Sequence, residues 1–287
     1  MGTIWELDFY SRPIVDENNK KIWEILICES PQEIAIAPAT LFQFAEYCTN
    51  TEVNSLRLKQ AIQTAIAQAP NPPDKIRFFR QAMTNMITKA CDDLGLPSVL
   101  SRRTYHLNYW LHQRLTEVYP QHPGFQPGTN PSVSFAATPP QPLPDALLGQ
   151  QWAFVSLEAG AIAEMGEWDI DFGEAFPLDL VGVPPTAMVP GLLIFSQRAV
   201  PLAAWMSGLE LANVAFDSEG TPQLLLETGV SDRWQLAKLA NSQLWAEAQK
   251  FEAAKQQAQG VHFLAVQTNP ESDRFAGFWL LQAPNIA

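Results

Sequence analysis

Two carboxylates stand close together near the start of the chain, in the stretch WELDFYSRP that ends at Pro13. Glu6 and Asp8 alternate there with apolar residues, which is typical of a β-strand with one apolar and one acidic face. Carboxylates on such a strand can hold metal ions that activate water against a phosphodiester. An ordinary amphipathic strand that ends in a turn at Pro13 shows the same pattern, so both interpretations stay open on this stretch alone.

A two-metal nuclease of the ribonuclease H type requires three carboxylates, from the first strand, the first helix and the end of the fourth strand. Asp8 fits the first place and Glu46 the second. The fourth expected strand instead ends at Arg80, where the third carboxylate would be needed. The second half of the chain resembles the first, as described below, and it has Ala212 near the place of Asp8. The sequence therefore disfavours a metal-dependent nuclease that uses Asp8 and Glu46.

The sequence contains few other patterns that are typical of catalytic sites. The four histidines lack the spacing of paired metal ligands, and the chain has neither a glycine-rich phosphate loop nor a nucleophile elbow. We therefore predict a binding protein rather than an enzyme, without a metal or another cofactor.

Alternation, turn residues and caps predict the elements that would position these groups. The expected elements are strands at 4–12, 21–28 and 33–37, a helical region from its N-cap Thr40 to about residue 69, a strand at 76–80, a helix at 82–94, a strand at 99–103 and a helix at 105–119. Three antiparallel strands followed by helix, strand and helix is the element order of a ribonuclease H-like fold, in the α/β class. Such an analogy does not transfer function.

The second half resembles the first when the sequence is shifted by 201 residues. Asp16 then falls on Asp217 in two turn sequences, DENN and DSEG, and Thr40 falls on Asn241. The shared order of turn, strand, short strand, N-cap, helix and strand indicates an ancient duplication. We therefore expect two related mixed-sheet units, each with three antiparallel strands and then helix–strand–helix, as tandem ribonuclease H-like units without catalysis.

Eight prolines lie between residues 120 and 150, in sequence with few apolar runs. Such composition is typical of an extended linker. We therefore expect an N-terminal α/β domain at 1–119, a Pro-rich linker at 120–150, and an acidic C-terminal α/β domain at 151–287 that is a degenerate repeat of the first.

The net charge of -12 argues against nucleic acid, but the basic residues are unevenly distributed. Residues 57–114 hold nine of the 18 Lys and Arg against three acids, a local charge of +6, whereas residues 115–197 hold nine acids and no Lys or Arg. Aromatic residues interleave with these arginines; guanidinium groups bind phosphates, and rings stack on unpaired bases. Charged, solvated helix faces would give the same pattern. The candidate RNA contacts are Arg12, Arg77, Arg80, Lys89, Arg102, Arg103, Tyr105 and Arg114.

No stretch approaches 18 uninterrupted apolar residues, so we expect no membrane insertion. The first residues contain no basic, apolar signal region and no Arg/Ser-rich transit segment. Three cysteines without metal-ligand spacing are typical of free thiols in a reducing compartment. These features predict a soluble, cytoplasmic protein.

The stretch GFWLLQ places Trp279, Leu280 and Leu281 close to the C-terminus. These residues either dock as a last element on the core or form an exposed tail that recruits a partner. We favour docking, because a free tail of this apolarity would tend to aggregate.

Several long, aromatic-rich stretches together resemble the Tab/Atab family of RNA-binding translation activators for photosystem subunits. The stretches are WELDFYSRP, RFFRQAMTNMI, SRRTYHLNYWL, VYPQHPGF, RAVPLAAWMSGLEL, GVHFLAVQTNP and GFWLL. The resemblance implies binding to A/U-rich single-stranded leader RNA of photosystem messages, promotion of their translation, and a functional role for the family's Trp-Leu-Leu, which matches residues 279–281. The lack of a transit segment favours a cyanobacterial, cytoplasmic relative.

The alternative function is a protein-interaction scaffold for photosystem assembly. It would use the acidic, Pro-rich middle and the C-terminal apolar tail, with translation or assembly proteins as partners.

Overall fold

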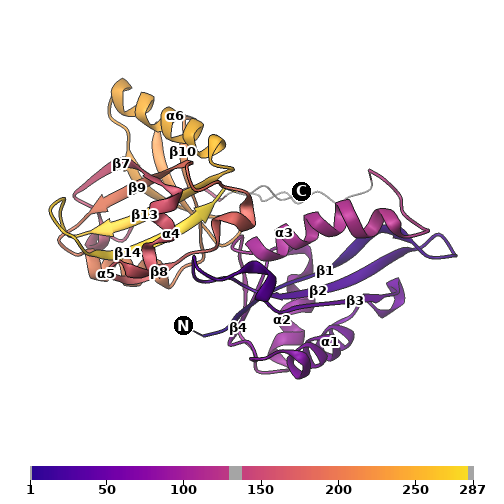
Figure 1. Ribbon diagram of the computed structural model, residues 1–287. Coiled ribbons are helices and arrows are strands. Elements are labelled where there is room, and N and C mark those ends of the chain that lie inside the picture. Colours follow the sequence, from indigo (N-terminus) through magenta and orange to yellow (C-terminus); the bar gives the residue numbers. More distant parts are fainter. Residues whose placement is uncertain (1, 129–137, 284–287) are drawn as a thin grey trace. The chain divides into compact units, whose positions relative to one another are not determined.

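The computed structural model describes residues 2–128 and 138–283. These residues form two compact units, and the chain is an α/β protein with three mixed sheets (Figure 1). Of the described residues, the first unit takes 2–30 and 38–128, and the second takes 31–37 and 138–283.

The first unit is built on a five-stranded sheet with the order β3-β2-β1-β4-β5. Its elements are β1 (Ile4–Val15), β2 (Lys21–Glu29), β3 (Gln43–Cys48), α1 (Ser55–Gln68), β4 (Lys75–Phe78), α2 (Thr84–Asp92), β5 (Ser98–Leu100) and α3 (Tyr105–Gln113). Strand β2 is antiparallel to both β1 and β3, whereas β4 is parallel to β1 and β5 is parallel to β4. This is the predicted order of three antiparallel strands, then helix, strand and helix. The ribonuclease H-like assignment itself stays a prediction.

The third strand lies later in the chain than the sequence predicted. Residues 33–37 form a turn and irregular chain, and residues 43–48, expected to be helical, form β3. The first long helix begins after Asn54, whose side chain accepts a hydrogen bond from the backbone N–H of Arg57, so Thr40 is not its N-cap. The prediction was wrong because Phe-Ala-Glu suits a helix and an edge strand equally well, and pairing with β2 decides between them.

Helices cover both faces of this sheet (Figure 1). Helices α1 and α2 pack on one face against the alternating apolar side chains of β1 and β2, in a core that includes Trp5, Leu7 and Phe9. Helix α3 lies over the opposite face (Figure 1), where its Leu107 backbone N–H donates to Glu6. One face of the sheet is therefore apolar and the other carries charge.

The second unit contains a four-stranded sheet, β10-β11-β12-β6, and a five-stranded sheet, β7-β9-β13-β14-β8. Its elements are β6 (Gln141–Pro142), β7 (Gln151–Glu158), α4 (Ala159–Ala163), β8 (Ile170–Glu174), β9 (Met188–Phe195), α5 (Ala199–Ser207), β10 (Leu211–Asp217), β11 (Gln223–Thr228), β12 (Asp232–Lys238), α6 (Ser242–Gln257), β13 (Val261–Gln267) and β14 (Phe275–Gln282). Side chains from both sheets and from α5 and α6 share one buried core cluster, which includes Leu226, Phe251 and Trp279.

The two units share a turn at positions that the 201-residue shift relates, and each has a helix capped by asparagine, but their sheets differ. In both units a hairpin turn begins with an aspartate, Asp16 or Asp217. Its side chain accepts a hydrogen bond from the backbone N–H of the residue two positions later. Both also have a long helix capped by an asparagine, Asn54 or Asn241. The shift by 201 also brings residues 44–46 onto residues 245–247, but the first lie in β3 and the second in α6. In the second unit β13 also joins a separate sheet, and a strand rather than a helix follows it.

Parts of the Pro-rich stretch 120–150 are hydrogen-bonded to the sheets. Val15 donates to the carbonyl of Gly124, and Gln126 donates to the carbonyl of Pro13, so residues 124–126 line the end of β1 in the first unit. Strand β6 pairs with β12 in the second unit. Residues 129–137 of the predicted linker lie outside the described residues.

Candidate nucleic-acid interface

Strand alternation places the N-terminal carboxylates on the sheet face below α3. Successive side chains of a strand point to opposite faces of the sheet. Trp5, Leu7 and Phe9 point into the apolar core, so Glu6 and Asp8 lie on the other face. Glu6 and Asp8 are both fully buried. Buried charges are costly unless they are paired, so this face requires cations.

Asp8 is paired with two arginines. Arg12 Nη1 lies 2.8 Å from Asp8 Oδ2, and Arg80 Nε lies 2.6 Å from Asp8 Oδ1. Burial alone would raise the pKa of Asp8, but Arg80 and Arg12 outweigh it and hold the pKa below the ordinary value. Asp8 is therefore an ion-pair acceptor with both oxygens engaged by guanidinium groups.

Glu24 on β2 is the second centre of the same network. Arg12 Nε lies 2.9 Å from Glu24 Oε2, Arg114 pairs with Oε1, and the Tyr119 hydroxyl donates to Oε2. Burial raises the pKa of the Tyr119 phenol, which keeps it protonated as a donor. Arg12 thus bridges the two carboxylates, Asp8 and Glu24.

Glu6 anchors the N-terminal end of α3. Its Oε2 accepts from the backbone N–H of Leu107 at 2.7 Å. Arg77 is its register partner on β4, so the two side chains share a face, and Arg103 is buried just before α3. The Cys28 thiol lies 4.0 Å from the same oxygen; its pKa is raised well above the ordinary value by burial and by Glu6.

The structure contradicts the nuclease alternative. Glu46 is aligned with Ile25 and Phe9 across β3, β2 and β1, so it lies on the face opposite to Asp8. It pairs there with Arg57 of α1 at 2.6 Å. Two carboxylates on opposite faces of one sheet cannot hold a shared metal pair. Within residues 2–128 and 138–283, no group of three His, Cys, Asp or Glu residues could hold a metal ion.

The candidate RNA contacts divide by exposure. Lys89 is exposed, and Arg102 and Arg114 are partly exposed. The others are buried: Arg12, Arg77, Arg80, Arg103 and Tyr105. Buried guanidinium groups have little surface to offer to a phosphate, so RNA contact through them would require the first unit to open.

The positive charge of residues 57–114 is balanced by the sequence before it. Residues 1–56 hold nine acids and three basic residues, a charge of -6 against the +6 that follows. Within the fold these charges meet, as Asp8 with Arg80, Glu24 with Arg114 and Glu46 with Arg57. The uneven distribution along the chain therefore produces internal ion pairs more than a basic surface.

Two tyrosines that the sequence did not single out flank the network. Tyr10, Glu24 and Tyr47 are register partners across β1, β2 and β3 and share one face. The Arg80 guanidinium lies 4.1 Å from the Tyr10 ring centroid, and Arg114 lies 5.9 Å from that of Tyr47. Tyr47 is 42% exposed. The alternation of residues 43–48 is the signal that could have found Tyr47, once those residues are taken as a strand.

The C-terminal Trp-Leu-Leu belongs to the core of the second unit. Trp279, Leu280 and Leu281 lie in β14 and are almost completely buried. Trp279 and Leu281 point into the shared core cluster. Gly277 has no side chain, and a Cβ there would overlap the Trp279 ring. The favoured docking of this stretch is thereby confirmed.

Two family models match the chain in order. The model described as "RNA-binding protein Tab2/Atab2 N terminal" matches residues 4–114, and "RNA-binding protein Tab2/Atab2, C-terminal domain" matches residues 130–282. The chain belongs to the Tab2/Atab2 family of RNA-binding proteins. The resemblance expected from the sequence is confirmed, and neither family description names a catalytic activity.

Two similar proteins come from plants. "Protein TAB2 homolog, chloroplastic" of Zea mays is 43% identical over 286 residues, with 96% of this chain and 70% of that protein covered. The protein of the same description from Arabidopsis thaliana is 41% identical over 284 residues, with 96% and 74% covered. Across the part of the chain that the structure describes, no helix is long and apolar enough to cross a bilayer.

Proposed function

We propose that this protein binds A/U-rich single-stranded leader RNA of photosystem messages and promotes the translation of photosystem subunits. The observation that carries the proposal is the match of both halves of the chain to RNA-binding Tab2/Atab2 models, in order and over most of its length. Plant relatives described as chloroplastic support a photosynthetic setting. The proposed role is non-catalytic and cytoplasmic.

The first unit supports such binding through its partly exposed aromatic and cationic groups. Tyr47 presents a ring beside Arg114, a combination that stacks on a base and contacts a neighbouring phosphate. Lys89 and Arg102 supply further surface cations among the predicted contacts. Because the unit as a whole is nearly neutral, we expect moderate affinity that depends on stacking as well as charge.

The scaffold alternative relied in part on an exposed C-terminal apolar tail. Residues 279–281 are buried in β14 and do not form such a tail. The acidic, Pro-rich middle remains as its support, with translation or assembly proteins as partners.

The test measures binding of the purified full chain to A/U-rich single-stranded RNA, to G/C-rich single-stranded RNA of equal length and to duplex RNA, by fluorescence anisotropy. The proposal expects tightest binding to the A/U-rich strand, with affinity that falls as salt rises. Crosslinking in cells followed by sequencing of the bound RNA identifies the messages. Equal, weak binding to all three probes would overturn the proposal.

A further inference from the structure

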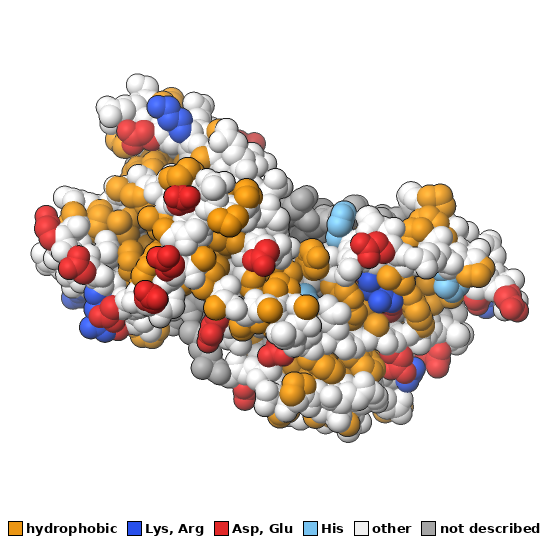
Figure 2. Space-filling view, viewed as in Figure 1, with side chains coloured by type: hydrophobic (Ala, Val, Ile, Leu, Met, Phe, Trp, Pro, Cys, Tyr) orange, Lys and Arg blue, Asp and Glu red, His pale blue; other side chains and the backbone are white. Residues whose placement is uncertain are grey.

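The second unit has the wrong charge for tracking a phosphate backbone. The range 130–282, matched by the C-terminal RNA-binding model, contains 17 acids and six basic residues. One of the six, Lys255, is buried and bonded to Asn213 and to the carbonyl of Val214. On the face shown in Figure 2, acidic side chains are spread among apolar ones over this unit. If the unit contacts RNA, chemistry other than a positive field has to hold it.

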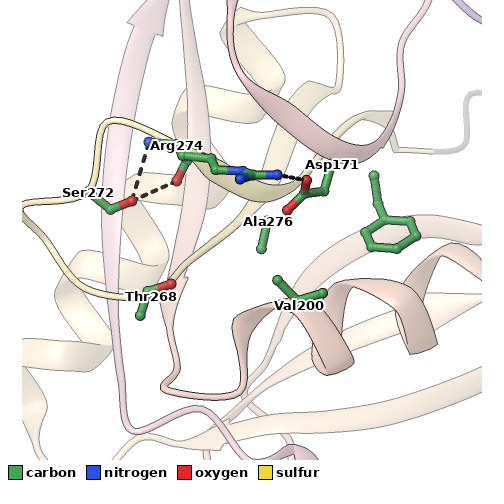
Figure 3. A pocket seen from close by; sticks show the side chains of 7 residues that line it. Asp171, Val200, Thr268, Ser272, Arg274 and Ala276 are labelled. Carbon is green, nitrogen blue, oxygen red and sulfur yellow. Dashed lines mark hydrogen bonds and ion pairs between the residues drawn. The ribbon is translucent and has the colours of Figure 1, made fainter.

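A pocket of about 450 Å³ lies at one end of the five-stranded sheet of this unit, within the size range of small-ligand sites. It is formed by β8, the start of α5, the connection from β13 to β14 and the start of β14 (Figure 3). Its lining residues are Asp171, Phe172, Val200, Thr268, Ser272, Arg274 and Ala276.

One side of the pocket is polar and fixed in place. Arg274 pairs with Asp171, and its Nε lies 3.5 Å from Asp169 (Figure 3 shows the first pair). The Ser272 hydroxyl bonds both to the carbonyl and to the N–H of Arg274, which holds the connection in shape. An arginine only donates hydrogen bonds and an aspartate only accepts them, so the pair complements a ligand edge with both kinds of group. The edges of nucleobases have this character.

The other lining residues, apart from Thr268, are apolar. Val200, at the start of α5, is 51% exposed, and it lines the pocket together with Phe172 and Ala276. Such a surface suits the face of a flat ring. Because two aspartates already balance the charge of Arg274, the site is poorly suited to a phosphate and better suited to a neutral ring.

We propose that this pocket binds one unpaired nucleobase of the RNA, with the base edge on Asp171 and Arg274 and the ring against Val200. The inference rests on the proposed RNA binding and locates a base-reading site in the acidic unit. The first unit and this pocket then hold different parts of one strand.

The test compares four single variants of the full chain on an A/U-rich single-stranded RNA by fluorescence anisotropy. Arg274→Met and Asp171→Ala remove the two edge contacts. Lys250→Met and Asp179→Ala remove the same charges from exposed positions of the unit outside the pocket. Removing the charge of Asp171 would by itself tighten RNA binding, so a weaker complex points to a lost contact rather than to electrostatics. Circular dichroism checks that each variant is folded, which we expect because Arg274 is 57% exposed.

We expect roughly tenfold weaker binding for Arg274→Met and Asp171→Ala, and changes below about twofold for the controls. A second set of probes replaces single nucleotides by abasic ones, which keep the phosphates. Wild type should lose affinity at one or two positions, and Arg274→Met should lose nothing further there. If all four variants bind RNA as tightly as wild type, the inference is overturned while RNA binding stands. The pocket would then serve another ligand, such as a peptide. Absence of binding by wild type would overturn the proposed function itself.

Discussion

The Arg80 guanidinium lies 2.6 Å from the carboxylate of Asp8, across the 72 residues that separate them in the chain. Arg80 follows β4, at the place where a two-metal nuclease requires its third carboxylate. A cation of the protein therefore neutralises the first carboxylate, and Arg12 does so from the other side. The face that could have carried hydrolysis holds the first unit together instead.

Replacing Asp8 should be strongly destabilising. Asp8→Asn leaves Arg12 and Arg80 buried beside a neutral group, and removing one partner of a buried pair costs roughly 3–5 kcal/mol. Urea unfolding of the full chain measures this loss. The matched control is Glu46→Gln, whose pair with Arg57 is partly exposed and should contribute below about 1 kcal/mol. Similar losses for the two variants would show that the network is not a stabilising core.

The same network predicts that the free energy of unfolding decreases at acidic pH. The pKa of Asp8 is lowered in the folded protein, so its contribution is fully present above its unfolded value of about 3.9. It is lost as the pH falls through the lower folded value. Unfolding free energies measured from pH 5 downward should therefore drop more steeply for wild type than for Asp8→Asn. Parallel profiles would contradict the pairing.

His262 predicts a second pH dependence, in the second unit. Its Nε2 accepts from the backbone N–H of Val214 and its Nδ1 bonds the carbonyl of Gly260. Burial and the neighbouring Lys255 lower its pKa well below the ordinary value, so the folded state keeps the ring neutral. The unfolded chain takes up a proton below about pH 6.5, so stability should fall as the pH decreases from there.

His262→Gln removes this titration and should flatten the profile between about pH 6.5 and 5. His106 of the first unit also has a lowered pKa, mainly from burial, and contributes in the same direction. Its own variant, His106→Gln, separates the two contributions. An unchanged slope in His262→Gln would mean that the ring is protonated in the folded protein.

Surface cations should carry the salt dependence of RNA binding. Lys89→Ala and Arg102→Ala are each expected to weaken A/U-rich RNA binding and to lower the slope of log affinity against log salt by about 0.7. Lys20→Ala, exposed in the hairpin turn outside residues 57–114, is the control and should leave the slope unchanged. By contrast, Arg103→Glu should unfold the first unit, because Arg103 is buried. Unchanged slopes for Lys89→Ala and Arg102→Ala would remove both residues from the interface.

Trp279, Leu280 and Leu281 should contribute mainly to the stability of the second unit. Leu280 is fully buried in β14, so Leu280→Ala should cost about 2–5 kcal/mol of unfolding free energy. Gln282→Ala, at the partly exposed end of the same strand, should cost little. Chemical denaturation of both variants is the measurement. Full stability of Leu280→Ala together with lost activity in cells would restore the partner-recruiting role.

Much of the first unit could be predicted from sequence periodicity. Strand alternation predicted β1 and β2, and the helix expected at 82–94 corresponds to α2. The turn at Asp16 and the cap at Asn241 were also predicted, because both depend on side chains that bond to their own backbone. Strand β3 could not be predicted, since its state depends on pairing with β2.

The candidate site was less predictable because exposure is a tertiary property. Arginines are rarely buried, so the sequence alone makes Arg77, Arg80 and Arg103 candidate RNA contacts. The carboxylate that pairs with a buried arginine can lie far away in the chain, as Asp8 does from Arg80. The lack of an acid at position 80 is nevertheless visible in the sequence, and it disfavours a nuclease that uses Asp8 and Glu46.

The spacing of the ion network also sets an order of events during synthesis. Glu24 reaches the solvent 95 residues before Tyr119, whose hydroxyl it binds in the folded unit. At roughly 5–20 residues per second, the nascent chain carries Asp8 and Glu24 without their full set of partners for on the order of ten seconds. Their charge keeps the emerging hairpin β1–β2 hydrated on one face, which opposes premature association between nascent chains. The first unit closes only after α3 and Tyr119 have left the ribosome.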